Sequence, residues 1–164
     1  MVENIIAFFS GLPAPLATTL LSALPIVELR LTIPVAIHEW SMTPGLAFGC
    51  GVVGALLPFL PLYFGLMKLR GWCERHVPKL VAPIDRVIAH GGRKLNAAYN
   101  KYGTIALFLL AAIPLPLAGV WSASVAAVAL KIPFKQAAIG MVLGTIAAGL
   151  IVTALSVTAD VVLQ

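Results

Sequence analysis

Residues 103–130 have the sequence GTIALFLLAAIPLPLAGVWSASVAAVAL, and this stretch decides the fold. It contains no charged residue and is long enough for one helix to cross the hydrocarbon core of a membrane. Pro114 and Pro116 interrupt its middle, however, and each lacks the backbone N–H that a continuous helix needs. The stretch is therefore either a kinked crossing or a re-entrant hairpin. We predict the hairpin, with arms of about 11–14 residues.

The distribution of basic residues favours the hairpin. Eight Lys and Arg residues fall within 68–102, against two acidic ones, Glu74 and Asp85. Loops rich in Lys and Arg stay in the cytoplasm. A hairpin keeps Lys131 and Lys135 on this same side, whereas a single crossing would move both outside. We therefore predict that 68–102 is cytoplasmic, and the helical spacing of its apolar residues predicts a basic amphipathic helix at the headgroups.

The overall composition is that of a membrane protein. Hydrophobic residues make up 60% of the chain and charged residues 10%, whereas soluble domains carry about 25% charged residues. Residues 44–67 and 133–158 are long apolar runs, each of which predicts a full crossing. We expect a multi-pass protein of the cytoplasmic (inner) membrane. Its net charge of +5 follows from the cytoplasmic loop, so we expect no nucleic-acid partner.

The first part of the chain repeats the pattern of the second. A shift of 89 positions places Pro25 on Pro114 and Pro44 on Pro133. The apolar arms around Pro25 are again too short to cross alone, which predicts another re-entrant hairpin. The cytoplasmic loop between the halves forces them into opposite orientations. The result is an inverted repeat, an architecture of transporters whose broken helices meet near the middle of the bilayer.

We therefore predict a single all-α integral membrane domain over 1–164. Its first repeat covers about 12–67 and its second about 103–158, and each is a re-entrant hairpin followed by a transmembrane helix. The cytoplasmic amphipathic connection 68–102 joins them. Because so few segments make only a thin wall around a cavity, we also expect a homodimer.

Glu28 and Arg30 are the charged residues of the predicted first tip. A charged side chain in the bilayer core costs about 2.5 kcal/mol or more, so it is paired or lines a wet cavity. Two interpretations stay open: an ion pair that holds the tip together, or a site where Glu28 carries a proton and Arg30 binds an anion. Residues two apart on a helix do not face each other, so a direct pair requires non-helical backbone between Pro25 and Pro34.

The predicted second tip offers backbone groups instead of charges. Pro114, Pro116 and Gly119 leave N–H and C=O groups without helical partners, and such groups must meet protein, water or a ligand inside a membrane. Trp121 and Ser122 follow at once and either contact a substrate or pack. These residues, with Glu28, Arg30 and Pro34, form the candidate substrate or proton site.

Catalytic and cofactor-binding motifs are absent from the sequence. His38, His76 and His90 are scattered, and Cys50 and Cys73 form no CxxC pair. No HExxH or serine-nucleophile motif occurs. We expect no enzymatic activity, no metal and no cofactor.

Two short motifs carry a family resemblance. ELR at 28–30 is followed by IP at 33–34, and AIPLPLAGVW occupies 112–121. With these motifs the chain resembles the small multidrug export protein family, which is similar to the DedA superfamily of VTT-domain membrane proteins. The resemblance implies two re-entrant hairpins that point at each other. It also implies proton-coupled movement of lipid phosphates, with Glu28 and Arg30 as the acid and the arginine of the first hairpin.

Together these observations predict a small, proton-linked translocase of an amphiphilic or lipid-phosphate substrate. Its expected partners are membrane lipids, that substrate and protons. Two alternatives remain: a small-molecule (multidrug) exporter, and a non-transporting membrane subunit that organises lipids or partners.

The predicted topology can be tested with thiol labelling in intact cells. Cys73 and a Lys131→Cys substitution should both react with an impermeant thiol reagent from the cytoplasmic side alone, because a hairpin returns the chain to that side. Labelling of position 131 from outside would remove the second hairpin and the inverted repeat together.

Overall fold

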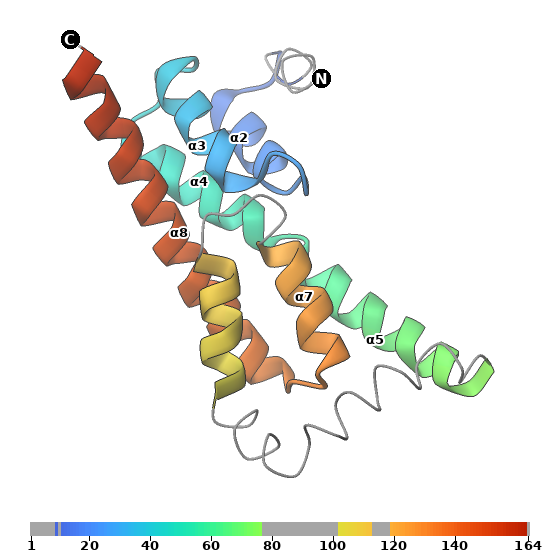
Figure 1. The fold of residues 1–164 in the computed structure, drawn as a ribbon. Helices are drawn as coiled ribbons and strands as arrows, with labels where there is room; N and C mark the ends of the chain where they lie inside the picture. Colours follow the sequence, from blue (N-terminus) through green and yellow to red (C-terminus); the bar gives the residue numbers. More distant parts are fainter. Residues whose placement is uncertain (1–8, 10, 77–101, 113–118, 164) are drawn as a thin grey trace.

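The structure, a computed structural model, describes residues 9, 11–76, 102–112 and 119–163 (Figure 1). Side chains are described as far as residue 159. This part of the chain is helical and contains no strand. The helices are α2 (Ala14–Ser22), α3 (Glu28–His38), α4 (Pro44–Leu56), α5 (Phe59–His76), an unlabelled helix Tyr102–Ala112 drawn in yellow, α7 (Val120–Ala129) and α8 (Phe134–Leu163). The all-α prediction is confirmed for the described residues.

Two helical stretches, Pro44–His76 and Phe134–Ala159, are long and apolar enough to cross a membrane. They contain the two crossings predicted from the sequence. The first is interrupted at Leu57 and Pro58, between α4 and α5. Pro58 explains this break, because its missing N–H and its ring disturb the preceding turn. Helix α5 continues nine residues beyond the predicted end of the crossing at residue 67.

The four shorter helices form two pairs. Helices α2 and α3 pack together across the turn 23–27, and the helix Tyr102–Ala112 packs with α7 in a shared apolar cluster. Figure 1 shows the first pair beside the C-terminal half of α8 and the second beside its N-terminal half. These pairs cover the residues of the two predicted hairpins. Pro114 and Pro116 lie outside the described residues, as do 77–101 of the predicted amphipathic connection; its first residues, 68–76, belong to α5.

Both pairs end in the same kind of turn. The residue that reverses the chain has a positive φ in each case, 49° at Ser41 and 55° at Lys131. The next residue, Met42 or Ile132, is buried. Pro44 begins α4, and Pro133 lies immediately before α8, which begins at Phe134. The two turns are thus similar, although Ser41 and Lys131 lie one position out of the register that aligns the prolines.

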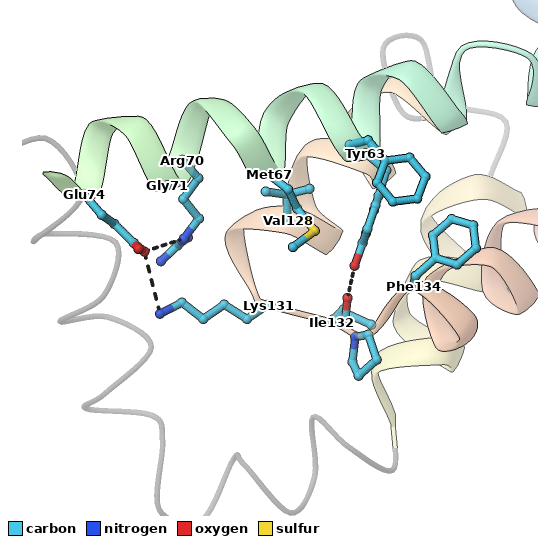
Figure 2. A pocket seen from close by; sticks show the side chains of 11 residues that line it. Tyr63, Met67, Arg70, Gly71, Glu74, Val128, Lys131, Ile132 and Phe134 are labelled. Carbon is cyan, nitrogen blue, oxygen red and sulfur yellow. Dashed lines mark hydrogen bonds and ion pairs between the residues drawn. The ribbon is translucent and has the colours of Figure 1, made fainter. Parts of the chain in front are cut away.

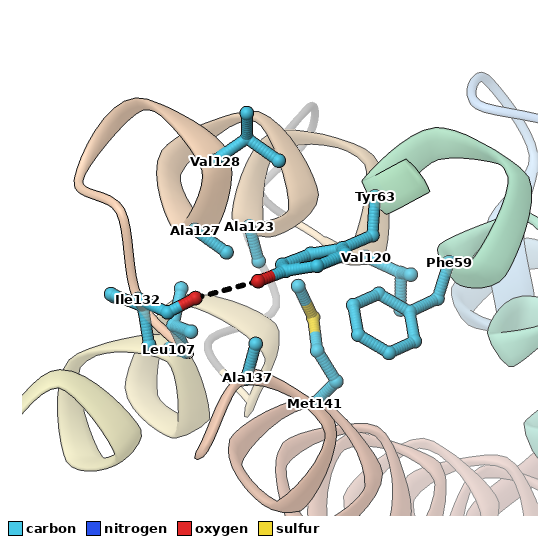
Figure 3. Packing of buried hydrophobic residues seen from close by; sticks show 10 residues of the cluster. All are labelled: Phe59, Tyr63, Leu107, Val120, Ala123, Ala127, Val128, Ile132, Ala137 and Met141. Atoms are coloured by element: carbon cyan, nitrogen blue, oxygen red, sulfur yellow. Dashed lines mark hydrogen bonds between the residues drawn. The ribbon is translucent and has the colours of Figure 1, made fainter. Parts of the chain in front are cut away.

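The buried core is divided into two clusters, and α8 contributes to both. The first cluster holds Leu29 and Ile33 of α3 with Ala148 and Val152 of α8. The second surrounds Tyr63 and is shown in Figure 3; its members are Phe59, Tyr63, Leu107, Val120, Ala123, Ala127, Val128, Ile132, Ala137 and Met141. The Tyr63 hydroxyl donates a hydrogen bond of 2.7 Å to the Ile132 carbonyl. Helix α8 therefore connects the two pairs.

Two glycines allow the long helices to approach the short ones. Each lies against a backbone carbonyl and a small side chain of the first helix in its pair. The contacts are Gly54 with Thr19 and Ser22, and Gly144 with Phe108 and Ala111. The corresponding partners are 89 positions apart in the chain, the same shift that aligns the prolines. Small residues permit such close backbone approach between membrane helices.

Large apolar side chains cover much of the outer surface. Leu155 is 64% exposed, Ile26 60%, Val53 57% and Leu150 56%. A soluble monomer rarely exposes so much contiguous apolar surface. Hydrocarbon is the solvent that suits these side chains, in agreement with the predicted membrane location.

The packing of α4 against α2 generates a matched pair of substitutions. Gly54→Ala should lower the free energy of unfolding by about 1–3 kcal/mol, because the added Cβ would overlap the Thr19 carbonyl. Gly49→Ala on the same helix has open space and should be neutral or slightly stabilising. Denaturant unfolding in detergent measures both. Equal effects of the two substitutions would contradict the packing.

Candidate functional site

The charged residues of the first helical pair form a direct ion pair. Arg30 Nη1 lies 2.9 Å from Glu28 Oε2, and the side chains of Arg30 and Glu28 are only 15% and 12% exposed. Glu28 has a φ of 46°, so the backbone leaves helical geometry at this residue. The sequence predicted that a direct pair requires non-helical backbone here. The structure limits that departure to the start of α3, which then continues through Pro34 to His38.

The second helical pair surrounds the ion pair with helix ends of matching polarity. Arg30 Nη2 donates a 3.3 Å hydrogen bond to the carbonyl of Ala111, in the last turn of the helix Tyr102–Ala112. A side chain at Gly119, the N-cap of α7, would overlap the Glu28 carboxylate. Helix C-termini attract cations and N-termini attract anions. Each charge therefore faces the helix end that favours it.

Trp121 and Ser122 have different roles at this junction. The Trp121 indole Nε1 donates to the carbonyl of Ala23 at 3.2 Å, which ties α7 to the turn after α2. Ser122 exchanges hydrogen bonds with the backbone of Gly119, at 3.0 and 3.1 Å, and so caps α7. The structure thus brings Glu28, Arg30, Gly119, Trp121 and Ser122 to one junction, and Pro34 lies one turn further along α3.

A groove of about 390 Å³ leads to Arg30 along α3 and α8. Arg30, Pro34 and His38 line it from one face of α3, four positions apart, and Leu155 and Ser156 are among the residues of α8 that line it. The groove runs toward the end of α3 that the sequence predicts to be outside. The contribution of α8 was not predicted, because residues 152–159 carry neither a charge nor a motif that would place them beside α3.

A larger cavity of about 650 Å³ lies at the other end of the molecule, between α5, α7 and the start of α8 (Figure 2). It includes neither Glu28 nor Arg30. Two of its charged residues, Arg70 and Glu74, belong to the connection that the sequence predicts to be cytoplasmic. Arg70 and Glu74 are four residues apart, which is the spacing of an ion pair on a helix. This spacing, directly after the apolar run 44–67, is the sequence feature that indicates a helix extending past residue 67.

Metal binding has no candidate cluster in the part of the chain that the structure describes. Among those residues, no group of three or more His, Cys, Asp or Glu side chains is placed to hold an ion. At the ion pair, the Glu28 carboxylate is a group that can take up a proton, and the Arg30 guanidinium is one that can bind an anion.

The model of a protein family described as "Putative small multi-drug export protein" matches residues 28–151. The chain belongs to this family. The match begins at Glu28 and continues through the second helical pair into α8. It therefore includes both residues of the ion pair and the helix ends of the second pair that face them. No curated protein and no solved structure matches the chain significantly. Membership of the small multi-drug export family and the two long apolar helices agree on a membrane location.

The ion pair can be tested by a double-mutant cycle. Glu28→Gln and Arg30→Gln should each lower the free energy of unfolding, because each leaves one charge with little solvent and no counter-charge. The double variant should recover part of the loss, with a coupling energy of about 0.5–3 kcal/mol. Unfolding of purified protein in detergent provides the measurement. Strict additivity of the two losses would show that the side chains do not interact.

Proposed function

We propose that this member of the small multi-drug export family is a proton-linked transporter that moves an amphiphilic, phosphate-bearing substrate past Glu28 and Arg30. The observation that carries the proposal is the ion pair of 2.9 Å, held between the ends of two helical pairs in an otherwise apolar region. Charged residues at membrane depth are functional candidates by default, because their burial is costly.

Protonation of Glu28 supplies the coupling. While Glu28 is ionised, its carboxylate neutralises Arg30 at 2.9 Å. When Glu28 takes up a proton, the guanidinium keeps its charge and attracts an anion more strongly. Arginine binds phosphate through two parallel N–H donors, so a phosphate headgroup suits it. Proton and anion therefore bind together, and loss of the proton restores the ion pair and releases the anion.

The surroundings of the pair suit a substrate with an apolar tail. Leu31 is 46% exposed and Ile26 60% exposed, and both lie close in sequence to the charged residues. A headgroup can pass Arg30 while its tail remains in the surrounding lipid. The groove along α3 and α8 provides a route between Arg30 and the end of the molecule near His38.

Movement of one helical pair against the other supplies alternating access. In this proposal the two pairs are re-entrant hairpins whose tips meet within the bilayer, as in transporters built from inverted repeats. The similar turns at Ser41 and Lys131, and the contacts of Gly54 and Gly144 with residues 89 positions apart, support the repeat. Polar links between the tips include the bonds from Arg30 to Ala111 and from Trp121 to Ala23.

The family description favours a second candidate, export of a small-molecule drug. A cationic drug would bind the ionised carboxylate of Glu28 and compete with Arg30 for it. Loss of Arg30 should then preserve or strengthen binding, whereas a phosphate substrate requires Arg30. The Arg30→Ala variant therefore separates the two candidates.

Transport can be measured in proteoliposomes with a fluorescent polyprenyl phosphate and a pH gradient. Wild type should move the lipid between leaflets, and Glu28→Gln and Arg30→Ala should each reduce the rate at least tenfold. Glu39→Gln is the matched control, because Glu39 is an exposed carboxylate just beyond α3 and should leave the rate unchanged. Variants are compared only after thermal unfolding shows that they fold.

Unchanged movement in Glu28→Gln would exclude Glu28 as the coupling site. Movement that is absent in folded wild type would exclude the phosphate substrate, and the same liposomes would then be tested with cationic drugs.

A further inference from the structure

The cavity of about 650 Å³ between α5, α7 and α8 has an apolar end and a charged end (Figure 2). Tyr63, Phe64, Met67 and Phe134 line the apolar end. Rings of Phe64 and Phe134 stack with centroids 5.3 Å apart, so this wall is built from packed aromatic side chains. The charged end is separate from Glu28 and Arg30, and its chemistry is independent of the function proposed above.

Two cations share one carboxylate at the charged end. Glu74 Oε1 lies 3.0 Å from Arg70 Nε and 3.9 Å from Lys131 Nζ (Figure 2). Arg70 also donates a 3.0 Å hydrogen bond to the Ala129 carbonyl. These three side chains carry a net charge of +1, and the longer separation from Lys131 leaves that contact the easier to replace.

Position along the helix gives the depth of this site in a membrane. Arg70 and Glu74 occupy the last turns of α5, immediately after the apolar stretch that is long enough to cross. Cations that follow an apolar span lie at the level of the lipid headgroups. The aromatic wall, nearer the middle of the helix, lies at the level of the acyl chains. Basic pockets between membrane helices on the cytoplasmic side bind anionic headgroups.

We propose that this cavity binds an anionic phospholipid of the surrounding leaflet. Its phosphate lies between Arg70 and Lys131, and the first part of an acyl chain packs along Phe64 and Phe134. Glu74 competes with the phosphate, because it occupies the same cations when the lipid is absent. The site joins the two halves of the chain, since Arg70 belongs to α5 and Lys131 to the turn between α7 and α8.

Native mass spectrometry of the full chain, released from detergent micelles, tests the proposal. The probes are phosphatidylglycerol and phosphatidylcholine with identical acyl chains, with and without added inorganic phosphate. Wild type should bind phosphatidylglycerol more tightly than phosphatidylcholine. Lys131→Gln should weaken phosphatidylglycerol binding about fivefold, the effect of one basic residue near an anionic headgroup.

Two further variants make the test specific. Lys135→Gln is the matched control, because Lys135 is an exposed lysine one turn further along that does not line the cavity, and it should leave binding unchanged. Glu74→Gln should tighten binding, because it removes the competing carboxylate while preserving size. Arg70→Gln should also weaken binding. If loss of the Arg70 hydrogen bond to Ala129 prevents this variant from folding, the result for Lys131→Gln decides the question.

Equal losses in Lys131→Gln and Lys135→Gln would overturn the proposal, because they would show attraction to net charge alone. Equal binding of the two lipids would overturn it as well. Displacement of phosphatidylglycerol by an equal concentration of inorganic phosphate would reject a lipid occupant and assign the cations to a free anion.

Discussion

The Glu28 carboxylate and the Arg30 guanidinium lie 2.9 Å apart, with the end of one short helix near the arginine and the start of another beside the acid. Neither helical pair can provide this environment alone. The charges come from the first pair, whereas the Ala111 carbonyl and the close approach of Gly119 come from the second. The need to stabilise two charges in an apolar protein therefore requires the ends of the two pairs to meet. Helix α8, which packs with both pairs, keeps them in register.

Close packing of backbone makes this meeting point possible in a small protein. Gly54 and Gly144 bring the long helices against the carbonyls of the short ones, so few residues suffice to enclose the charges. The same economy leaves much apolar surface facing outward.

Local signals in the sequence predicted much of this arrangement. Pro44 and Pro133 mark the starts of the long helices, because proline is accepted in a first turn and disruptive later. The charges of Glu28 and Arg30 pointed to the candidate site, because charge is rare in so apolar a chain. Contacts between distant segments were not predictable, since nothing in one sequence couples Arg30 to a carbonyl 81 positions away. The cavity at the end of α5 was missed for the same reason: its aromatic wall comes from segments far apart in the chain.

The central claim is that the tips of the helical pairs meet inside the bilayer, and the depth of the first tip tests it most directly. Ile26 is 60% exposed in the turn between α2 and α3, and Glu39 is exposed at the open end of the same pair. Spin labels on Ile26→Cys and Glu39→Cys, in protein without its native cysteines, would be compared in liposomes by power saturation with oxygen and a nickel chelate. The account predicts that position 26 lies near the bilayer centre, accessible to oxygen and shielded from nickel, while position 39 lies at the headgroups. Position 26 at headgroup depth would contradict it.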